Sequence, residues 1–82
     1  MIPPRIKDVC VLEDYLIKIK YINGEEKIYD MKKQLQFDFY KNLINKGYFA
    51  LVKSVETTIE WPNGEDMDPN ELYEKSCSIN NK

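Results

Sequence analysis

The feature that most constrains this chain is an Asn-Gly pair between two β-favouring runs, in the stretch YLIKIKYINGEEKIYD at residues 15–30. Asn and Gly both tolerate the positive φ of a two-residue type I′ turn, so the stretch predicts a β-hairpin. A turn of that length places Ile22 opposite Glu25 and Ile19 opposite Ile28. The core face of the hairpin would then carry Ile17, Ile19, Tyr21 and Ile28, and the solvated face would carry Lys18, Lys20 and Lys27.

A further strand is expected before the hairpin. The stretch IKDVCVL is short and rich in β-branched side chains, and the prolines Pro3 and Pro4 before it disfavour a helix. Glu13 and Asp14 then turn the chain into the hairpin. We expect this first strand, or the strand that ends at Asp30, to form an edge of the sheet, where a partner can add a strand or two copies can associate weakly.

The middle of the chain predicts one short helix and a second pair of strands. Within residues 36–46, in the stretch FDFYKNLINK, apolar residues recur at spacings of three and four, as on one face of a helix. These residues are Phe37, Tyr40, Leu43 and Ile44. The following stretch ALVKSVETTIEW predicts two short strands around a turn near Glu56 and Thr57. The side chains expected to point inward there are Val52, Val55, Ile59 and Trp61.

The stretch IEWPNGEDMDPNELYEKS, residues 59–76, combines a turn with a helix start. The Pro-Asn-Gly after Trp61 suits the second, third and fourth positions of a type I turn. Asp68 is the expected N-cap of a helix over residues 69–76, with Glu71 at the third helical position of a capping box. The side chains expected to hold this helix against the sheet are Met67, Leu72 and Tyr73.

Together these elements predict the α+β class: a small antiparallel sheet with an N-terminal hairpin, a short central helix, a second short strand pair and a C-terminal helix. A chain of 82 residues has room for one hydrophobic core, so we expect a single domain over residues 1–77. The polar remainder SINNK, residues 78–82, is predicted to be a frayed tail.

Charge and composition argue against several classes of protein. With 12 basic and 14 acidic residues the net charge is −2, which lacks the basic footprint of direct nucleic-acid binding. No apolar run reaches the roughly 18–20 residues of a membrane span. Cys10 and Cys77 have no zinc-site spacing and are expected to be free, buried thiols, which suits a reducing compartment. The start MIPPRIKD lacks the features of a secretory signal, so a cytoplasmic location is expected.

Motifs for catalysis or metal binding are also missing from the sequence. The chain has no histidine to serve as a base for its hydroxyl groups, and its three glycines form no phosphate loop. Asp66, Asp68 and Asn70 have the alternate spacing of a calcium loop, but Glu71 and Cys77 stand where that loop needs Gly and Glu. We therefore expect no enzyme activity, no catalytic residue, no cofactor and no metal.

Four residues around the Pro-Asn-Gly turn are candidates for contact with a protein partner. Asn63, Glu65 and Asp66 have no evident structural duty and are expected at an exposed polar tip. Trp61 is the fourth candidate, because Trp is enriched at binding hot spots. The alternative for Trp61 is a core position under the following helix, where a Trp at the end of a strand in a small protein more often lies.

Several of these stretches resemble a family of small bacterial proteins, domain of unknown function 2442. The resemblance spans the chain and rests on the hairpin and on the closing pattern WPNGEDMDPNELY. The matching residues are Asn23, Gly24, Glu25 and Asp30 in the hairpin, and Trp61, Pro62, Asn63, Gly64, Asp66, Pro69, Leu72 and Tyr73 in the closing pattern. Residues 31–49 depart from the family, whose members usually have a proline-containing segment there.

The resemblance implies an antiparallel α+β fold, like that of the N-terminal domain of a Nitrosomonas protein that also carries a helix-turn-helix domain. Stand-alone members are similar to small proteins encoded beside proteins of domain of unknown function 4160, an arrangement that resembles a toxin–antitoxin or regulatory pair. The expected function is a non-enzymatic protein-interaction module, the antitoxin-like or regulatory partner of a neighbouring-gene product. The alternatives are an accessory domain that acts indirectly in transcription and an enzyme of unrecognised type.

Overall fold

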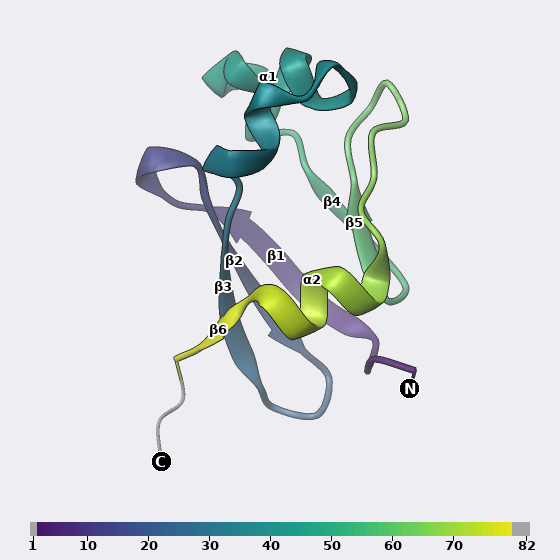
Figure 1. Ribbon diagram of the computed structural model, residues 1–82. Helices are drawn as coiled ribbons and strands as arrows, with labels where there is room; N and C mark the ends of the chain where they lie inside the picture. Colours follow the sequence, from purple (N-terminus) through teal and green to yellow (C-terminus); the bar gives the residue numbers. More distant parts are fainter. Residues whose placement is uncertain (1, 80–82) are drawn as a thin grey trace.

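The computed structural model describes residues 2–79, which form two antiparallel sheets (Figure 1). The larger sheet has the strand order β1-β2-β3-β6, and the smaller sheet pairs β4 with β5. The strands are β1 (Ile6–Val11), β2 (Leu16–Tyr21), β3 (Glu26–Asp30), β4 (Lys53–Val55), β5 (Thr58–Glu60) and β6 (Cys77–Ser78).

Short helical segments join these strands. The 3₁₀ helices are η1 (Glu13–Tyr15), η2 (Lys32–Gln36) and η3 (Asp38–Ile44), and the α-helices are α1 (Lys46–Phe49) and α2 (Pro69–Lys75). Figure 1 shows the segment from η2 to α1 gathered at one end of the molecule, with α2 crossing in front of the larger sheet before β6. The predicted α+β class is confirmed.

The N-terminal hairpin forms, but its loop has three residues instead of the predicted two. The Tyr21 N–H donates to Glu25 O at 2.9 Å, and the Gly24 N–H donates to Tyr21 O at 3.0 Å. Gly24 has a φ of +95°, the left-handed region that the last residue of a three-residue hairpin loop requires. The predicted register is therefore wrong by one residue.

One extra loop residue exchanges the two faces of β3. Ile19 pairs with Lys27 instead of Ile28, and Lys27 is buried on the inner face. Its ammonium donates to Tyr73 O at 2.6 Å and lies 3.7 Å from the centroid of the Tyr73 ring, so the buried charge has partners. Ile28 pairs with Lys18 and is half-buried on the outer face, which corrects its predicted core position.

The hydrophobic core lies between the inner face of the larger sheet, β5, α2 and the helical segments. The rings of Phe49 and Trp61 stack there with their centroids 6.0 Å apart. Its buried members are Ile6, Ile17, Ile19, Tyr21, Tyr29, Met31, Leu43, Phe49, Ile59, Trp61, Met67 and Leu72, and partly buried side chains packed against them include Val52, Tyr40 and Tyr73.

The predicted central helix is a series of short 3₁₀ turns. Two of the four side chains predicted to form its apolar face are therefore exposed. Tyr40 and Leu43 do pack inward, and they are three residues apart, which is the period of a 3₁₀ helix. Phe37 has extended dihedral angles between η2 and η3, and its side chain is exposed. Ile44 ends η3 and is exposed as well.

The second strand pair forms around the predicted turn. Glu56 has a φ of 53°, and its carbonyl accepts a hydrogen bond from the Ile6 N–H at 2.7 Å, which ties the turn to the start of β1. Ile59 is fully buried, as predicted. The inward prediction for Val55 is wrong, because Val55 pairs with Thr58 beside the turn and is exposed.

α2 begins as the sequence predicts. The Asp68 carboxylate accepts a hydrogen bond from the Glu71 N–H at 3.0 Å, and Pro69 is the first helical residue. Met67 and Leu72, on either side of this start, are both buried. The cap and its two apolar neighbours thus fix the angle at which α2 enters the core.

The larger sheet has β1 at one edge, in agreement with one of the two predicted edges, whereas β3 lies between β2 and β6. Ser78 pairs with Lys27 in β6, although the sequence pattern places Ser78 in a frayed tail. The last part of that predicted tail, residues 80–82, lies outside the described residues.

Both cysteines are free and exposed, so the prediction that they are buried is wrong. Cys10 pairs with Lys18 and Cys77 pairs with Ile28, which places both on the outer face of the larger sheet. The buried core members of these strands occupy the other face. Across residues 2–79, no helix has the length and apolar character needed to cross a membrane.

Candidate functional site

The predicted contact tip is a tight turn that packs against α1. The Gly64 N–H donates to Trp61 O at 2.9 Å, and the Trp61 N–H donates to Glu65 O at 2.8 Å, which closes a three-residue loop. Gly64 has a φ of +99°, a conformation that residues with a Cβ atom rarely adopt. The Trp61 indole N–H donates to Phe49 O at 2.8 Å and so anchors the turn to α1.

The Glu65 carboxylate anchors the same turn to the helical segments. The Tyr48 hydroxyl donates to one carboxylate oxygen at 2.7 Å, and the Asn42 side-chain amide donates to the other at 3.3 Å. The Tyr48 hydroxyl oxygen also accepts a hydrogen bond from the Asn63 N–H at 2.8 Å. Glu65 therefore joins the turn to η3 and α1.

The protonation of this contact suits a structural role. Burial raises the pKa of the Glu65 carboxyl, but hydrogen bonds from Tyr48, from its own backbone N–H and from Asn42 outweigh burial and lower the pKa below its ordinary value. Burial and the hydrogen bond to Glu65 raise the pKa of the Tyr48 phenol. A carboxylate and a phenol therefore persist together near neutral pH, with no proton exchanged between them.

Two of the four predicted contact residues are buried. Trp61 is fully buried, which is the alternative that the sequence left open. Glu65 is 5% exposed, so the prediction that it has no structural duty is wrong. Asn63 and Asp66 are exposed, and the Asp66 carbonyl accepts a hydrogen bond from the Tyr40 hydroxyl at 2.7 Å. Only these two of the four remain at the surface of the turn.

Exposed apolar side chains gather in the neighbouring segment, residues 37–51. Their exposed fractions are 52% for Phe37, 57% for Phe39, 55% for Ile44 and 56% for Leu51. We call these four side chains the apolar end. Sequence reasoning missed them because it assigned Phe37 and Ile44 to a buried helix face. The signal that could have found them is Phe37 and Phe39 two residues apart, a spacing that no single helix face can bury.

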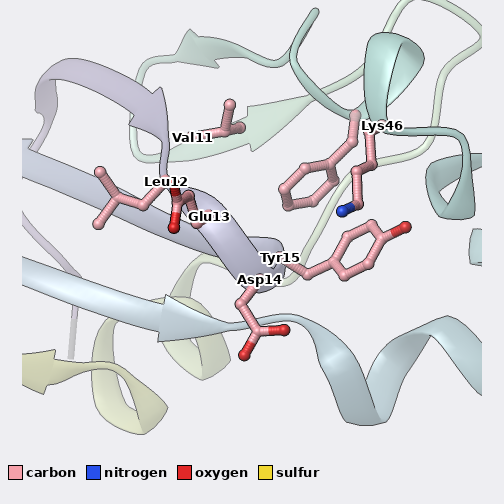
Figure 2. Close-up of a pocket in the computed structure, with 7 residues that line it drawn as sticks. Val11, Leu12, Glu13, Asp14, Tyr15 and Lys46 are labelled. Atoms are coloured by element: carbon pink, nitrogen blue, oxygen red, sulfur yellow. The ribbon is translucent and has the colours of Figure 1, made fainter.

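A pocket of about 480 Å³ lies between the end of β1, η1 and α1 (Figure 2). Phe49 is buried at this position, and Lys46 precedes it by one turn on α1. The Lys46 ammonium lies 5.7 Å from the centroid of the Tyr15 ring, and the Tyr15 ring meets Phe49 edge-on with centroids 5.2 Å apart. The lining residues are Val11, Leu12, Glu13, Asp14, Tyr15, Lys46 and Phe49.

The backbone beside this pocket is strained. Asp14 and Tyr15 have φ values of 65° and 60°, which for residues with a Cβ atom cost on the order of 1–2 kcal/mol each. The Lys32 ammonium donates to the Asp14 carbonyl and carboxylate, both at 3.2 Å, and the Tyr15 hydroxyl donates to Ile44 O. These bonds hold the Tyr15 ring in place as a wall of the pocket.

The lining of the pocket combines charged and apolar groups. Its charged lining groups are Glu13, Asp14 and Lys46, and its lining includes no serine, cysteine or histidine. Among residues 2–79, no group of three or more His, Cys, Asp or Glu side chains is placed to hold a metal ion. This pocket could not be predicted from the sequence, because the strained residues of η1 that shape it follow no residue pattern.

Comparison with protein families gives a match over most of the chain. The model of a family described as a protein of unknown function (DUF2442) matches residues 6–77, which is most of the chain. The comparisons with curated proteins and with solved structures give no match.

Proposed function

The chain belongs to the DUF2442 family, whose proteins are of unknown function, and from this premise we propose that it is a non-enzymatic protein-interaction module. The observation that supports this proposal is the apolar end. Four of the nine large apolar side chains exposed within the described residues lie in residues 37–51. Covering such side chains with a partner releases water from apolar surface, which favours association.

The chemistry of the apolar end suits a protein contact. Phe37 and Phe39 are aromatic, a class enriched at the centres of protein interfaces. The Phe39 ring packs edge-on against the Tyr40 ring with centroids 4.8 Å apart, so its position is held before a partner arrives. An anchor that is already ordered loses less conformational entropy on binding.

The exposed residues in and beside the turn at 61–65 supply polar groups close to residues 37–51, which carry the apolar end. The Tyr40 hydroxyl reaches the Asp66 carbonyl, and the Tyr48 hydroxyl reaches the Asn63 N–H. Both tyrosines belong to the segment that carries the apolar end. Asn63 and Asp66 therefore suit the polar rim of an interface whose centre is apolar.

The partner that we propose is the product of a neighbouring gene, of the domain of unknown function 4160 type, with the present chain as its antitoxin-like or regulatory subunit. The family resemblance is what supports this choice of partner. A net charge of −2 argues against a direct contact with nucleic acid, so any role in transcription would be exerted through the partner.

Capture of the partner from the source cell tests the proposal. The tagged chain and the double variant Phe37→Ser/Phe39→Ser are expressed in parallel, crosslinked and purified, and bound proteins are identified by mass spectrometry. We expect the wild-type chain to recover a neighbouring-gene product and the double variant to lose it. Both positions are exposed, so the substitutions should change stability by only about 0.5 kcal/mol.

Lys41→Ser is the matched control, because Lys41 is an exposed residue of η3 outside the apolar end. This variant should recover the partner as the wild type does. The purified pair should then bind in a titration with the same dependence on Phe37 and Phe39. If no specific partner is recovered, or if the double variant recovers it equally well, the apolar end is not an interaction surface.

A further inference from the structure

The pocket beside Lys46 has a different character from the apolar end, and it points to a ligand of its own. We propose that it binds a small monocarboxylate with an apolar or aromatic body, which goes beyond the proposed protein contact. Its volume of about 480 Å³ lies within the range of roughly 300–1,000 Å³ that is usual for small-molecule sites.

The apolar body of the ligand would lie against the walls of the pocket. Val11, Tyr15 and Phe49 supply one aliphatic and two aromatic walls. The edge-on contact between Tyr15 and Phe49 and the hydrogen bond from Tyr15 to Ile44 O fix the two rings before binding. A cavity whose aromatic walls are already in place suits a flat or branched apolar group.

The carboxylate of the ligand would pair with Lys46. Lys46 is exposed, and Figure 2 shows its ammonium directed towards the Tyr15 ring, another lining residue of the pocket. The ion pairs formed within residues 2–79 involve Lys18, Lys20 and Lys32, and none of them involves Lys46. The Lys46 ammonium therefore has a ring as its neighbour and no carboxylate of residues 2–79 within 4.0 Å, which leaves it able to receive one.

The acidic residues around the pocket do not prevent Lys46 from binding a carboxylate. Asp14 is paired with Lys32 at 3.2 Å, and Figure 2 shows its carboxylate pointing away from Tyr15 and Lys46. Glu13 lies on the opposite side of the pocket from Lys46 and is exposed. Glu13 would oppose an anionic ligand without contacting its carboxylate, so its charge should weaken binding slightly.

A nuclear magnetic resonance titration of the full chain with phenylacetate tests this site, with the neutral phenylacetamide as the matched probe. We expect saturable shifts in the amides of Val11, Tyr15 and Phe49 with phenylacetate, and at least about tenfold weaker binding of phenylacetamide. Lys46→Met keeps the aliphatic stem and removes the charge, so it should weaken phenylacetate binding by about tenfold or more. Lys41→Met, an exposed control outside the pocket, should leave the affinity unchanged.

Glu13→Gln should change the affinity in the opposite direction from Lys46→Met. It should tighten phenylacetate binding by about twofold, because it removes a negative charge from the far side of the pocket. A merely structural role of either residue would not produce this pair of opposite effects. The proposal is overturned if phenylacetate gives no saturable shift up to about 10 mM, if the shifts fall outside the pocket, or if the two probes bind equally well. It also fails if Lys46→Met leaves the affinity unchanged.

Discussion

Two turns in this chain share the pattern aromatic-x-Asn-Gly-Glu, at residues 21–25 and 61–65. Each begins with a buried aromatic residue, closes with the same two backbone hydrogen bonds, and holds its glycine at a φ of +95° or +99°. In each, the final glutamate accepts a hydrogen bond from a distant phenol, that of Tyr73 in the first turn and that of Tyr48 in the second. One short pattern therefore builds one local structure twice.

The two turns differ in what surrounds them. Residues 21–25 connect β2 and β3, which pair over five residues, whereas residues 61–65 are flanked by a single bridge between Glu60 and Asp66. The glutamate of the first turn is partly exposed, and that of the second is buried against the helical segments. The local pattern thus sets the shape of the turn, and the flanking segments decide whether the turn is a surface feature or part of the core.

The largest expected effect is at Trp61, the buried aromatic residue of the second turn. Trp61→Ala should lower the free energy of unfolding by about 3–5 kcal/mol, because it empties a fully buried site and leaves Phe49 O without its donor. Urea unfolding followed by circular dichroism measures this loss. A loss below about 1.5 kcal/mol would mean that the second turn is no more part of the core than an ordinary surface site.

The next largest effect should be a difference in stability loss between the two turns when their glutamates are replaced. Glu65→Ala should cost about 1–3 kcal/mol, because it leaves the Tyr48 hydroxyl and the Asn42 amide without their acceptor. Glu25→Ala should cost less, about 0.5–1 kcal/mol, because water can replace a carboxylate that is partly exposed. Equal losses in urea unfolding would contradict the difference in burial between the turns.

The same glutamates predict how stability depends on pH. Hydrogen bonds from Tyr73 and Asn23 lower the pKa of Glu25, and the hydrogen bonds to Glu65 lower its pKa against the effect of burial. A lowered pKa in the folded state means that each carboxylate stabilises the fold above its ordinary pKa of 4.5 and that this contribution is lost as the pH falls below it.

Glu65→Gln should therefore flatten the loss of stability below that pH, and Glu25→Gln should do the same through the other turn. Chemical unfolding at a series of acidic pH values checks this. Variants with the same acid dependence as the wild type would show that neither carboxylate has a lowered pKa in the fold.

The two glycines should be equivalent, since the turns share their geometry. A Cβ atom at Gly24 or Gly64 meets no heavy atom within 4 Å, so the cost of Ala is that of the backbone conformation alone. Gly24→Ala and Gly64→Ala should each cost about 1–2 kcal/mol. If one loss exceeds the other severalfold in urea unfolding, the two turns do not share one backbone structure.

The sequence predicted the second turn better than the first, and the reason is local. Pro62 has a fixed φ that suits the second position of a type I turn, so the position of the reversal could be assigned. Residues 21–25 have no proline, and Asn-Gly was assigned to a two-residue turn, which shifted β3 by one residue. The repeated pattern within the chain was the signal that could have corrected this register.

The features that sequence reasoning missed depend on distant contacts. Glu65 reads as a surface residue after a turn, and its burial follows from Tyr48 and Asn42, which precede it by 17 and 23 residues. The positive φ values of Asp14 and Tyr15 are held by contacts with later segments, so they leave no local pattern. The strands, the Asp68 cap and α2 could be predicted because local residue preferences determine them.

The smallest expected effect is at the aromatic residue of the first turn. The Tyr21 hydroxyl is buried and has no hydrogen-bond partner within the described residues, and burial, followed by the charges of Tyr73 and Glu25, raises its pKa to about 12. Tyr21→Phe removes an unsatisfied polar group and keeps the ring, which packs edge-on against Tyr73. We therefore expect stability to be unchanged or raised by up to about 1 kcal/mol.

Tyr48→Phe is the matched control, and it should lower stability because the Tyr48 hydroxyl bonds Glu65 and Asn63. If Tyr21→Phe is the more destabilising of the two in urea unfolding, the Tyr21 hydroxyl has a partner in solution, and the first turn is anchored to the core as firmly as the second.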